Sequence, residues 1–229
     1  MDTLVWKSKF FRRPRFLKNP AAPILAAAMF AGPAYLPWNF GVAGETGLPE
    51  IADIEMKDWV LQDQDGRTVR FLSDVVQDRI AVVNFMYSQC TTACPLTSAV
   101  FGKVQESLGA RLDREVRLIS ITLDPVSDTP ERLKGYSRRF NAGPGWIWLT
   151  GGSSTIRSLL QDMKIYIDDV RTHPPILLIG DGRRKLWTRL YGFQGAKKIM
   201  ARIDRLLKSG SQAPDGTKPD ALADRLPRS

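Results

Sequence analysis

Both cysteines of this 229-residue chain lie in one short stretch, "NFMYSQCTTACPLTS", residues 84–98. An apolar run precedes them, and three residues separate Cys90 from Cys94. We expect this run to be a buried strand that delivers the cysteines into the first turn of a helix. The free N–H groups and the dipole of such a turn stabilise a thiolate, so both thiols are predicted to be reactive.

The spacing of the two cysteines bears on the kind of chemistry they do. On a regular helix, residues four apart have Cβ atoms about 5–6 Å from each other, whereas a disulfide prefers a Cβ separation of about 3.8 Å. A Cys90–Cys94 disulfide therefore needs an irregular turn, whereas two thiolates on one helix face can converge on a metal. A structural disulfide, which is common in exported proteins, would close a very short loop and stabilise the fold little.

A metal held by two thiolates needs a further ligand from elsewhere in the chain. Soft thiolates select Cu(I) or Zn(II). The one histidine, His173, stands in "DDVRTHPPILLIG" at the start of a predicted strand. Loops that enter and leave neighbouring strands can meet at one end of a sheet, so His173 is a candidate third ligand. On these residues alone, an incidental histidine is the alternative.

The elements that must position these residues alternate between strand and helix. The predicted order is a hairpin, then βαβα, then β, α and ββα, which is typical of an α/β sandwich with a central, partly parallel sheet. The hairpin is predicted at 59–76, strands at 79–87, 115–123 and 145–152 and twice within 174–193, and helices from the cysteines to 108 and at 128–140, 153–163 and 195–209. In the first helix one apolar face is expected, which consists of Leu96, Val100, Val104 and Leu108 with Phe101 beside them.

The formal net charge of +9 is concentrated near the amino end. Residues 1–20 carry a net charge of +5, and the rest of the chain only +4. An uncharged stretch with four prolines follows at 19–44. We interpret residues 1–45 as a basic signal peptide or membrane anchor that places the remaining chain outside the cytoplasm, and we do not interpret the charge as a nucleic-acid site. The tail at 209–229 is rich in Pro, Gly and Asp and is predicted to be disordered.

Four motifs in order carry a family resemblance: "NFMYSQCTTACPLT", "SITLDPVSDTPERLKGY", "WIWLTG" and the lone histidine before "LLIGDG". Together, over a domain at 50–208, they resemble the Sco/SenC family of thioredoxin-fold proteins from bacterial and mitochondrial inner membranes. The resemblance implies a thioredoxin-like three-layer sandwich with an N-terminal β-hairpin. It also implies copper ligation by Cys90, Cys94 and His173, with Asp124 near the metal.

The chain departs from the family pattern directly after the histidine. Pro174 and Pro175 stand where the family usually has Ser or Thr and then apolar residues. They resemble the proline that abuts the dithiol of thioredoxins, and they bear on how His173 approaches the site. Other acidic residues of the second motif have a structural interpretation: Asp128 is expected to cap the helix at 128–140, with Glu131 completing a capping box.

Two functions from different classes follow. The first is a membrane-associated copper chaperone, in the bacterial inner membrane facing the periplasm or exported to it, that binds Cu(I), and Cu(II) through the same donors. It would deliver copper to the binuclear copper centre of cytochrome c oxidase, or prepare that centre, with an oxidase subunit or another copper chaperone as partner. The second is a thiol-disulfide oxidoreductase that uses Cys90 and Cys94 on the cysteines of an oxidase subunit or another exported protein. A peroxidase is disfavoured, because no threonine ahead of the cysteine with a nearby arginine is recognisable.

Overall fold

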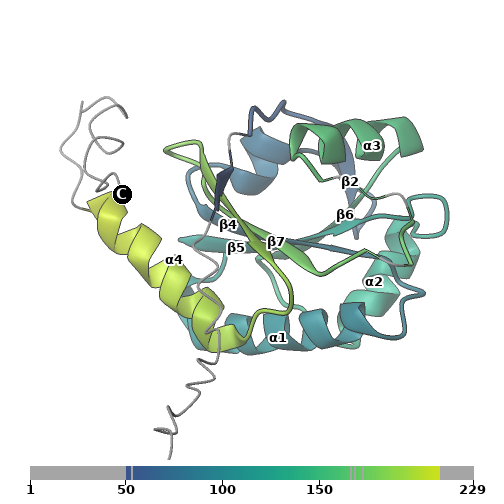
Figure 1. Ribbon diagram of the computed structural model, residues 1–229. Coiled ribbons are helices and arrows are strands. Elements are labelled where there is room, and N and C mark those ends of the chain that lie inside the picture. Colours follow the sequence, from purple (N-terminus) through teal and green to yellow (C-terminus); the bar gives the residue numbers. More distant parts are fainter. Residues whose placement is uncertain (1–49, 53, 166, 168, 172, 212–229) are drawn as a thin grey trace, which may run out of the picture. The chain divides into compact units, whose positions relative to one another are not determined.

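The computed structural model describes residues 50–52, 54–165, 167, 169–171 and 173–211. Within these residues, eight strands form a single sheet in the order β1-β8-β7-β4-β5-β6-β2-β3. Helices cover both faces of this sheet, with α1 and α2 on one face and α3 on the other (Figure 1). The segment predicted to be a signal or anchor lies outside the described residues.

The elements follow the predicted alternation. The strands are β1 (Glu50–Ala52), β2 (Val60–Asp63), β3 (Thr68–Arg70), β4 (Ile80–Met86), β5 (Val116–Thr122), β6 (Trp146–Thr150), β7 (Ile176–Asp181) and β8 (Leu186–Tyr191). The helices are α1 (Ala93–Leu108), α2 (Pro130–Arg138), α3 (Ser153–Asp162) and α4 (Ala196–Ser211), with a π-helix η1 (Phe71–Val76) and a 3-10 turn η2 (Gly109–Arg111). The helix α4 therefore includes the first residues of the tail, and the rest of the tail lies outside the described residues.

Strand β4 is at the centre of the sheet, and all seven of its residues are buried. Strand β4 is parallel to β5 and antiparallel to β7. Strand β5 is in turn parallel to β6. Parallel neighbours need a crossover connection. In the chain, α1 connects β4 to β5 and α2 connects β5 to β6. The predicted hairpin is present as β2 and β3, and β2 also pairs with β6, so the hairpin extends the main sheet.

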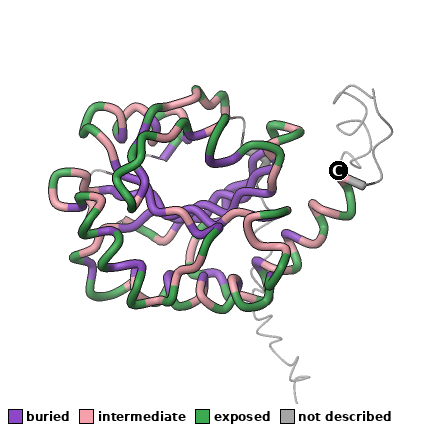
Figure 2. The backbone as a smooth tube through the Cα atoms, turned by 180° about the vertical axis from the view of Figure 1, so that it is seen from behind, coloured by how far each residue is buried: buried purple, intermediate pink, exposed green. Residues whose placement is uncertain are grey.

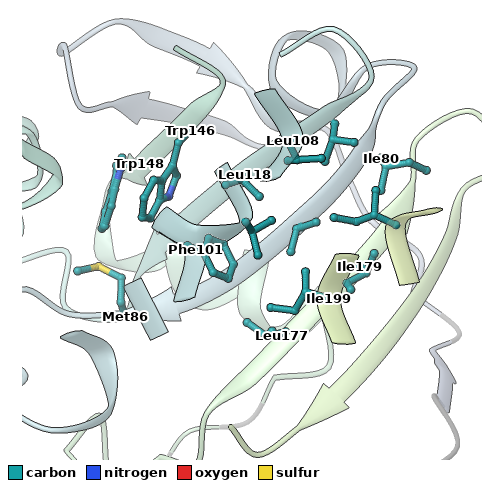
Figure 3. Packing of buried hydrophobic residues seen from close by; sticks show 14 of the residues in the cluster. Ile80, Met86, Phe101, Leu108, Leu118, Trp146, Trp148, Leu177, Ile179 and Ile199 are labelled. Atoms are coloured by element: carbon teal, nitrogen blue, oxygen red, sulfur yellow. The ribbon is translucent and has the colours of Figure 1, made fainter. Parts of the chain in front are cut away.

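Two apolar cores lie on opposite faces of the sheet. One includes Phe71, Ile156 and Leu159 from η1 and α3. The other, drawn in Figure 3, packs α1, α2 and α4 against the sheet around Trp146 and Trp148. Figure 2 shows the same arrangement as buried strands between helices whose outer faces are exposed. Trp146 and Trp148 are both buried and pack in this core.

The apolar face of α1 differs from the expected one. Its buried residues are Cys94, Ser98, Phe101, Val104 and Leu108, whereas the predicted first member of the face, Leu96, is 59% exposed. A spacing of four residues drifts by about 40° per step around a helix of about 3.6 residues per turn. The predicted row Leu96, Val100, Val104 and Leu108 therefore does not stay on the core face along the whole helix. At the start of the helix, Cys94 faces the core in place of Leu96.

Two smaller expectations also change. The second strand of the hairpin ends at Arg70, because residues 71–76 turn into η1. The N-cap of α2 is Thr129, whose side chain accepts a hydrogen bond from the Arg132 N–H, with Pro130 in the first turn. The expectation that Asp128 caps this helix is therefore wrong, and its carboxylate has other partners.

Truncation of a core aromatic provides a test of this packing. Phe101 is fully buried and its ring centroid lies 5.7 Å from that of Trp146. We expect Phe101→Ala to lower the free energy of unfolding by about 3–5 kcal/mol, because it removes apolar contacts and leaves a cavity. Phe193→Ala, which truncates an exposed phenylalanine, should change it by less than about 0.5 kcal/mol. Denaturant unfolding measures both, and equal losses would contradict the described core.

Candidate metal centre

The cysteines lie in the loop that joins β4 to α1. The strand ends at Met86, whose carbonyl accepts a hydrogen bond from the Leu123 N–H, so the loop leaves the sheet beside the end of β5. A turn then forms in which the Cys90 N–H donates to the Tyr87 carbonyl at 3.1 Å. The helix begins at Ala93, which places Cys94 in its first turn, as the sequence predicted. The prediction that Cys90 also lies in this turn is wrong, because Cys90 stands in the loop before the N-cap residue Thr92.

The Cys90 sulfur acts as the cap of this helix. Thr92 occupies the N-cap position without a side-chain hydrogen bond to the helix. Instead, the backbone N–H of Cys94 donates to the Cys90 sulfur at 3.4 Å. The first N–H groups of a helix have no partner within the helix, so the sulfur satisfies one of them and gains stabilisation of its negative charge.

Cys90 and Cys94 differ in acidity. Burial raises the pKa of Cys90, but hydrogen bonds with Cys94 and Thr92 outweigh it and bring this pKa down from 9.0 to about 7. Burial and then the hydrogen bond with Cys90 raise the pKa of Cys94 to about 12, against the opposing effect of the Tyr87 N–H. Only Cys90 is therefore a thiolate near neutral pH. The prediction that both thiols are reactive is corrected for Cys94, because its burial favours the neutral thiol.

His173 reaches the same end of the sheet from the loop before β7. Since β7 is antiparallel to β4, with Leu177 opposite Asn84, β7 starts where β4 ends. His173 and Cys94 line one small pocket, together with Thr97. The imidazole also meets the ring of Tyr87 edge-on, with centroids 6.4 Å apart. The fold therefore brings the lone histidine to the cysteine loop over about eighty residues of sequence.

The imidazole is oriented by its own loop. Its Nδ1 lies 3.0 Å from the Pro174 carbonyl, so the tautomer with a proton on Nδ1 donates there and leaves the lone pair on Nε2. Metal-ligating histidines commonly carry such an outer hydrogen bond. Pro174 thus supplies a carbonyl partner to His173, a role that its position after the histidine did not reveal.

The three predicted ligands are near one another but do not form a closed metal site. Among the described side chains, no group of three or more His, Cys, Asp or Glu residues could hold a metal ion as placed. Both cysteines are free thiols. The donor types nevertheless fit copper, because two sulfurs and an imidazole suit a soft ion that also accepts nitrogen. Ligation by Cys90, Cys94 and His173 stays a prediction, and it requires these three side chains to be arranged differently from their present placement.

The two aspartates of the D-P-x-x-D motif have different roles in the structure. The Asp124 carboxylate accepts the Ser127 N–H at 3.2 Å within the turn that the motif opens. The Asp128 carboxylate is fully buried and accepts hydrogen bonds from the Ser88 N–H at 3.1 Å, the Ser88 hydroxyl and the Thr122 hydroxyl at 2.6 Å. It also contributes to the raised pKa of Cys94, after burial and the hydrogen bond with Cys90. A place for Asp124 beside the metal stays a prediction.

Sequence reasoning missed Asp128 as a residue of the site. Its carboxylate joins the cysteine loop, through Ser88, to the end of β5, through Thr122. An Asp-Thr-Pro string is also what a helix start looks like, so the capping interpretation was available from local sequence and the buried one was not. The polar residues Ser88 and Thr122, at the ends of two predicted neighbouring strands, were the only sequence feature that pointed to a buried partner.

Comparison with known proteins agrees with this geometry. The SCO1/SenC family model matches residues 50–208. This chain is a member of the SCO1/SenC family. Curated relatives include the SCO1 protein homolog of Bacillus subtilis, 30% identical over 113 residues, which are 49% of this chain and 57% of that protein. A putative copper-binding protein of Stutzerimonas stutzeri is 30% identical over 89 residues, 39% of this chain and 43% of that protein. The chain thus matches about half of the length of these curated relatives.

Solved Sco structures share the fold. BsSco, a Sco protein of cytochrome c oxidase assembly in which a disulfide switch was identified, matches with a TM-score of 0.60 at 23% identity, over 72% of this chain and 97% of that one. Yeast Sco1 with copper bound matches with a TM-score of 0.57 at 18% identity, over 72% and 97%. The predicted thioredoxin-like α/β fold is confirmed.

Within the described part of this family member, no helix is both long and apolar enough to cross a bilayer.

The asymmetry of the thiols can be tested by titration of the reduced protein. We expect one thiolate to appear with a midpoint at about pH 7, from Cys90, and the second only at strongly alkaline pH, because the pKa of Cys94 is about 12. Ultraviolet thiolate absorbance measures this, and Cys90→Ser should remove the neutral transition. Two thiolates that ionise together near neutral pH would contradict the described loop.

The role of Asp128 can be tested against Asp124 with the same substitution. Asp128→Asn keeps the shape but loses charge-assisted hydrogen bonds to Ser88 and Thr122, so we expect it to lower the free energy of unfolding by about 2–3 kcal/mol. Asp124→Asn weakens one turn contact at the surface and should cost less than about 1 kcal/mol. Denaturant unfolding compares the two, and the reverse order would show that Asp128 does not hold the loop.

Proposed function

We propose that this protein is a copper-binding chaperone that carries copper to the binuclear copper centre of cytochrome c oxidase, or prepares that centre. The observation that carries the proposal is the placement of a thiolate-forming Cys90, a second thiol and the lone imidazole at one end of the sheet. Membership of the SCO1/SenC family and the copper-bound yeast Sco1 structure support it.

Copper is the cargo in this proposal. The Cys90 thiolate is available near neutral pH, whereas Cys94 must release its proton for its sulfur to bind. Copper binding therefore releases a proton, and the affinity should rise with pH. Thiolates favour Cu(I), and imidazole accepts both Cu(I) and Cu(II).

Three ligands leave one side of the metal open. A recipient can then add its own ligands before the chaperone's ligands leave, so that copper moves by stepwise exchange. Suitable recipients are an oxidase subunit or another copper chaperone. His173 can offer Nε2 to copper, because Nδ1 donates to the Pro174 carbonyl and leaves the Nε2 lone pair free.

The proposal places this domain outside the cytoplasm, at the bacterial inner membrane and facing the periplasm. Support comes from the basic start of the chain and the uncharged stretch that follows it. Fractionation of cells that express the full chain is the test: recovery with the inner membrane or in the periplasm agrees with the proposal, and recovery in the cytoplasm contradicts it.

A thiol-disulfide oxidoreductase is the second candidate, and the split in acidity favours it. The Cys90 thiolate would attack one sulfur of a target disulfide and expel the other as a thiolate. Cys94 would then lose its proton and attack the Cys90 sulfur, which releases the second target thiolate and leaves a Cys90–Cys94 disulfide. An attacking thiol with a pKa near the ambient pH is well suited to this exchange. A disulfide switch was identified in BsSco, which has a similar fold.

The decisive experiment is Cu(I) binding under anaerobic, reducing conditions with a competing chelator. We expect equimolar, tight binding by the wild type, and losses of at least about tenfold in affinity for both Cys90→Ser and His173→Ala, since each removes a ligand. Thr91→Ser, a conservative change at an exposed residue of the same loop, should bind as the wild type does.

The variants also separate the two functions. Disulfide exchange with a small disulfide peptide should fail in Cys90→Ser and survive in His173→Ala. If His173→Ala binds copper as tightly as the wild type, the three-ligand site is wrong. If no variant and no wild-type protein binds copper while exchange proceeds, the oxidoreductase replaces the chaperone.

A further inference from the structure

The loop between β8 and α4 presents exposed aromatic and basic side chains next to one another. Tyr191 is 54% exposed and Phe193 is 52% exposed. Lys197 and Lys198 follow within four to five residues of Phe193 and are both exposed. We call these four residues the β8–α4 patch. None of them is assigned a role in copper binding or disulfide exchange.

The patch is held in a fixed shape. The Arg189 guanidinium lies over the Tyr191 ring, 6.0 Å from its centroid. Gly192 has a φ of +76°, which glycine adopts without strain. The Gln194 side chain donates to the Tyr191 carbonyl at 2.6 Å, which ties the loop to itself. The apolar side chains are therefore exposed by a rigid loop, so little ordering entropy is lost when they are buried against a partner.

The two lysines stand where the helix itself disfavours them. The first turn of α4 carries no acidic residue, and Lys197 and Lys198 lie in that turn. The N-terminal end of a helix is the positive end of its dipole, so basic side chains there are unfavourable by a few tenths to about 1 kcal/mol each. An anionic partner would offset this cost, which indicates the sign of charge that the patch binds.

The position of the patch favours a lipid surface over an acidic protein. The first described strand, β1, is antiparallel to β8, with Glu50 opposite Arg189. The chain that precedes Glu50, which includes the basic and uncharged segments predicted to meet the membrane, therefore joins the domain beside the carboxyl end of β8. Tyr191 follows Arg189 by two residues. The segment predicted to meet a membrane is thus the one that leads into the strand paired with β8, which favours a lipid surface as the partner of the patch.

The composition of the patch agrees with an interfacial contact. Aromatic rings occupy the headgroup level of bilayers, and lysines near them attract anionic lipids. The patch is also continuous with the candidate metal centre, because the Gly192 N–H donates to the Pro175 carbonyl at 2.9 Å, two residues from His173. Helix α4, which carries the lysines in its first turn, packs beside α1 (Figure 1).

We propose that the β8–α4 patch docks the domain on an anionic phospholipid bilayer, with Phe193 and Tyr191 at the headgroup level and Lys197 and Lys198 on the lipid phosphates. Docking in this way turns the end of the sheet that carries Cys90 and His173 toward the membrane surface. A recipient whose metal site lies near the bilayer then meets this end first. The proposal does not rest on the copper role, since it concerns residues outside the ligand set.

Vesicle flotation of residues 45–229 tests the proposal. This compact unit contains every described strand and helix and both cores. The probes are vesicles of phosphatidylcholine alone and of phosphatidylcholine with an equal amount of phosphatidylglycerol. We expect binding to the anionic vesicles only, and weaker binding as salt is added. No binding to anionic vesicles at low salt would overturn the proposal, as would equal binding to both kinds of vesicle.

Two matched double variants locate the contact. Phe193→Ser with Lys197→Gln removes one apolar side chain and one lysine from the patch, and binding should weaken by about tenfold or more. Lys185→Gln with Leu186→Ser removes the same kinds of side chain, both exposed, from the opposite end of β8, and binding should stay as in the wild type. Equal loss in both variants, or none in either, would overturn the patch as the docking surface.

Two further measurements keep the result clear. The thiolate titration should be the same in both double variants and the wild type, which shows that the fold and the cysteine loop are intact. If the first variant does not fold, Lys197→Gln with Lys198→Gln is compared with Lys103→Gln with Lys185→Gln. Binding to polyglutamate but not to anionic vesicles would assign the patch to an acidic protein and overturn the lipid proposal.

Discussion

The contact on which the site depends is the one between the Cys90 sulfur and the backbone N–H of Cys94, at 3.4 Å. It caps the first turn of α1 and at the same time stabilises a negative charge on that sulfur. Because the sulfur is both cap and candidate ligand, a metal or a disulfide at Cys90 competes with the cap. Copper binding and redox chemistry at Cys90 are therefore both coupled to the start of the helix.

Strand β4 and its two neighbours hold the loop in which the Cys90–Cys94 contact forms. Strand β4 is buried along its whole length between a parallel and an antiparallel neighbour. The parallel neighbour, β5, ends beside the cysteine loop and is joined to it by the buried Asp128 carboxylate. The antiparallel neighbour, β7, begins there and carries His173 at its entry. Because β4 is parallel to β5 and antiparallel to β7, the loop that follows β4 and the loop that precedes β7 lie at the same end of the sheet.

The two candidate functions use the same physical asymmetry. A chaperone needs one sulfur that is ready to bind and a second that binds when its proton leaves, whereas an oxidoreductase needs one attacking thiolate and one protonated thiol in reserve. Hydrogen bonds with Cys94 and Thr92 lower the pKa of Cys90, and burial raises that of Cys94, which is the direction that suits both functions. The imidazole distinguishes the functions, since disulfide exchange has no use for His173. The proposed docking of the β8–α4 patch would orient the site toward a membrane, because the patch lies on the loop that is hydrogen-bonded to Pro175.

The sequence by itself determined the alternation of strands and helices, the place of Cys94 in the first turn of a helix, and the family. These follow from local apolar patterns and from motifs whose residues are close in the chain. The sequence did not determine which apolar row of α1 faces the core, that Asp128 is buried against Ser88 and Thr122, or that only Cys90 ionises near neutral pH. Each of these depends on burial and on hydrogen-bond partners brought together by the pairing of β4 with β5 and β7. Local sequence patterns carry no record of such partners, so tertiary structure alone decided them.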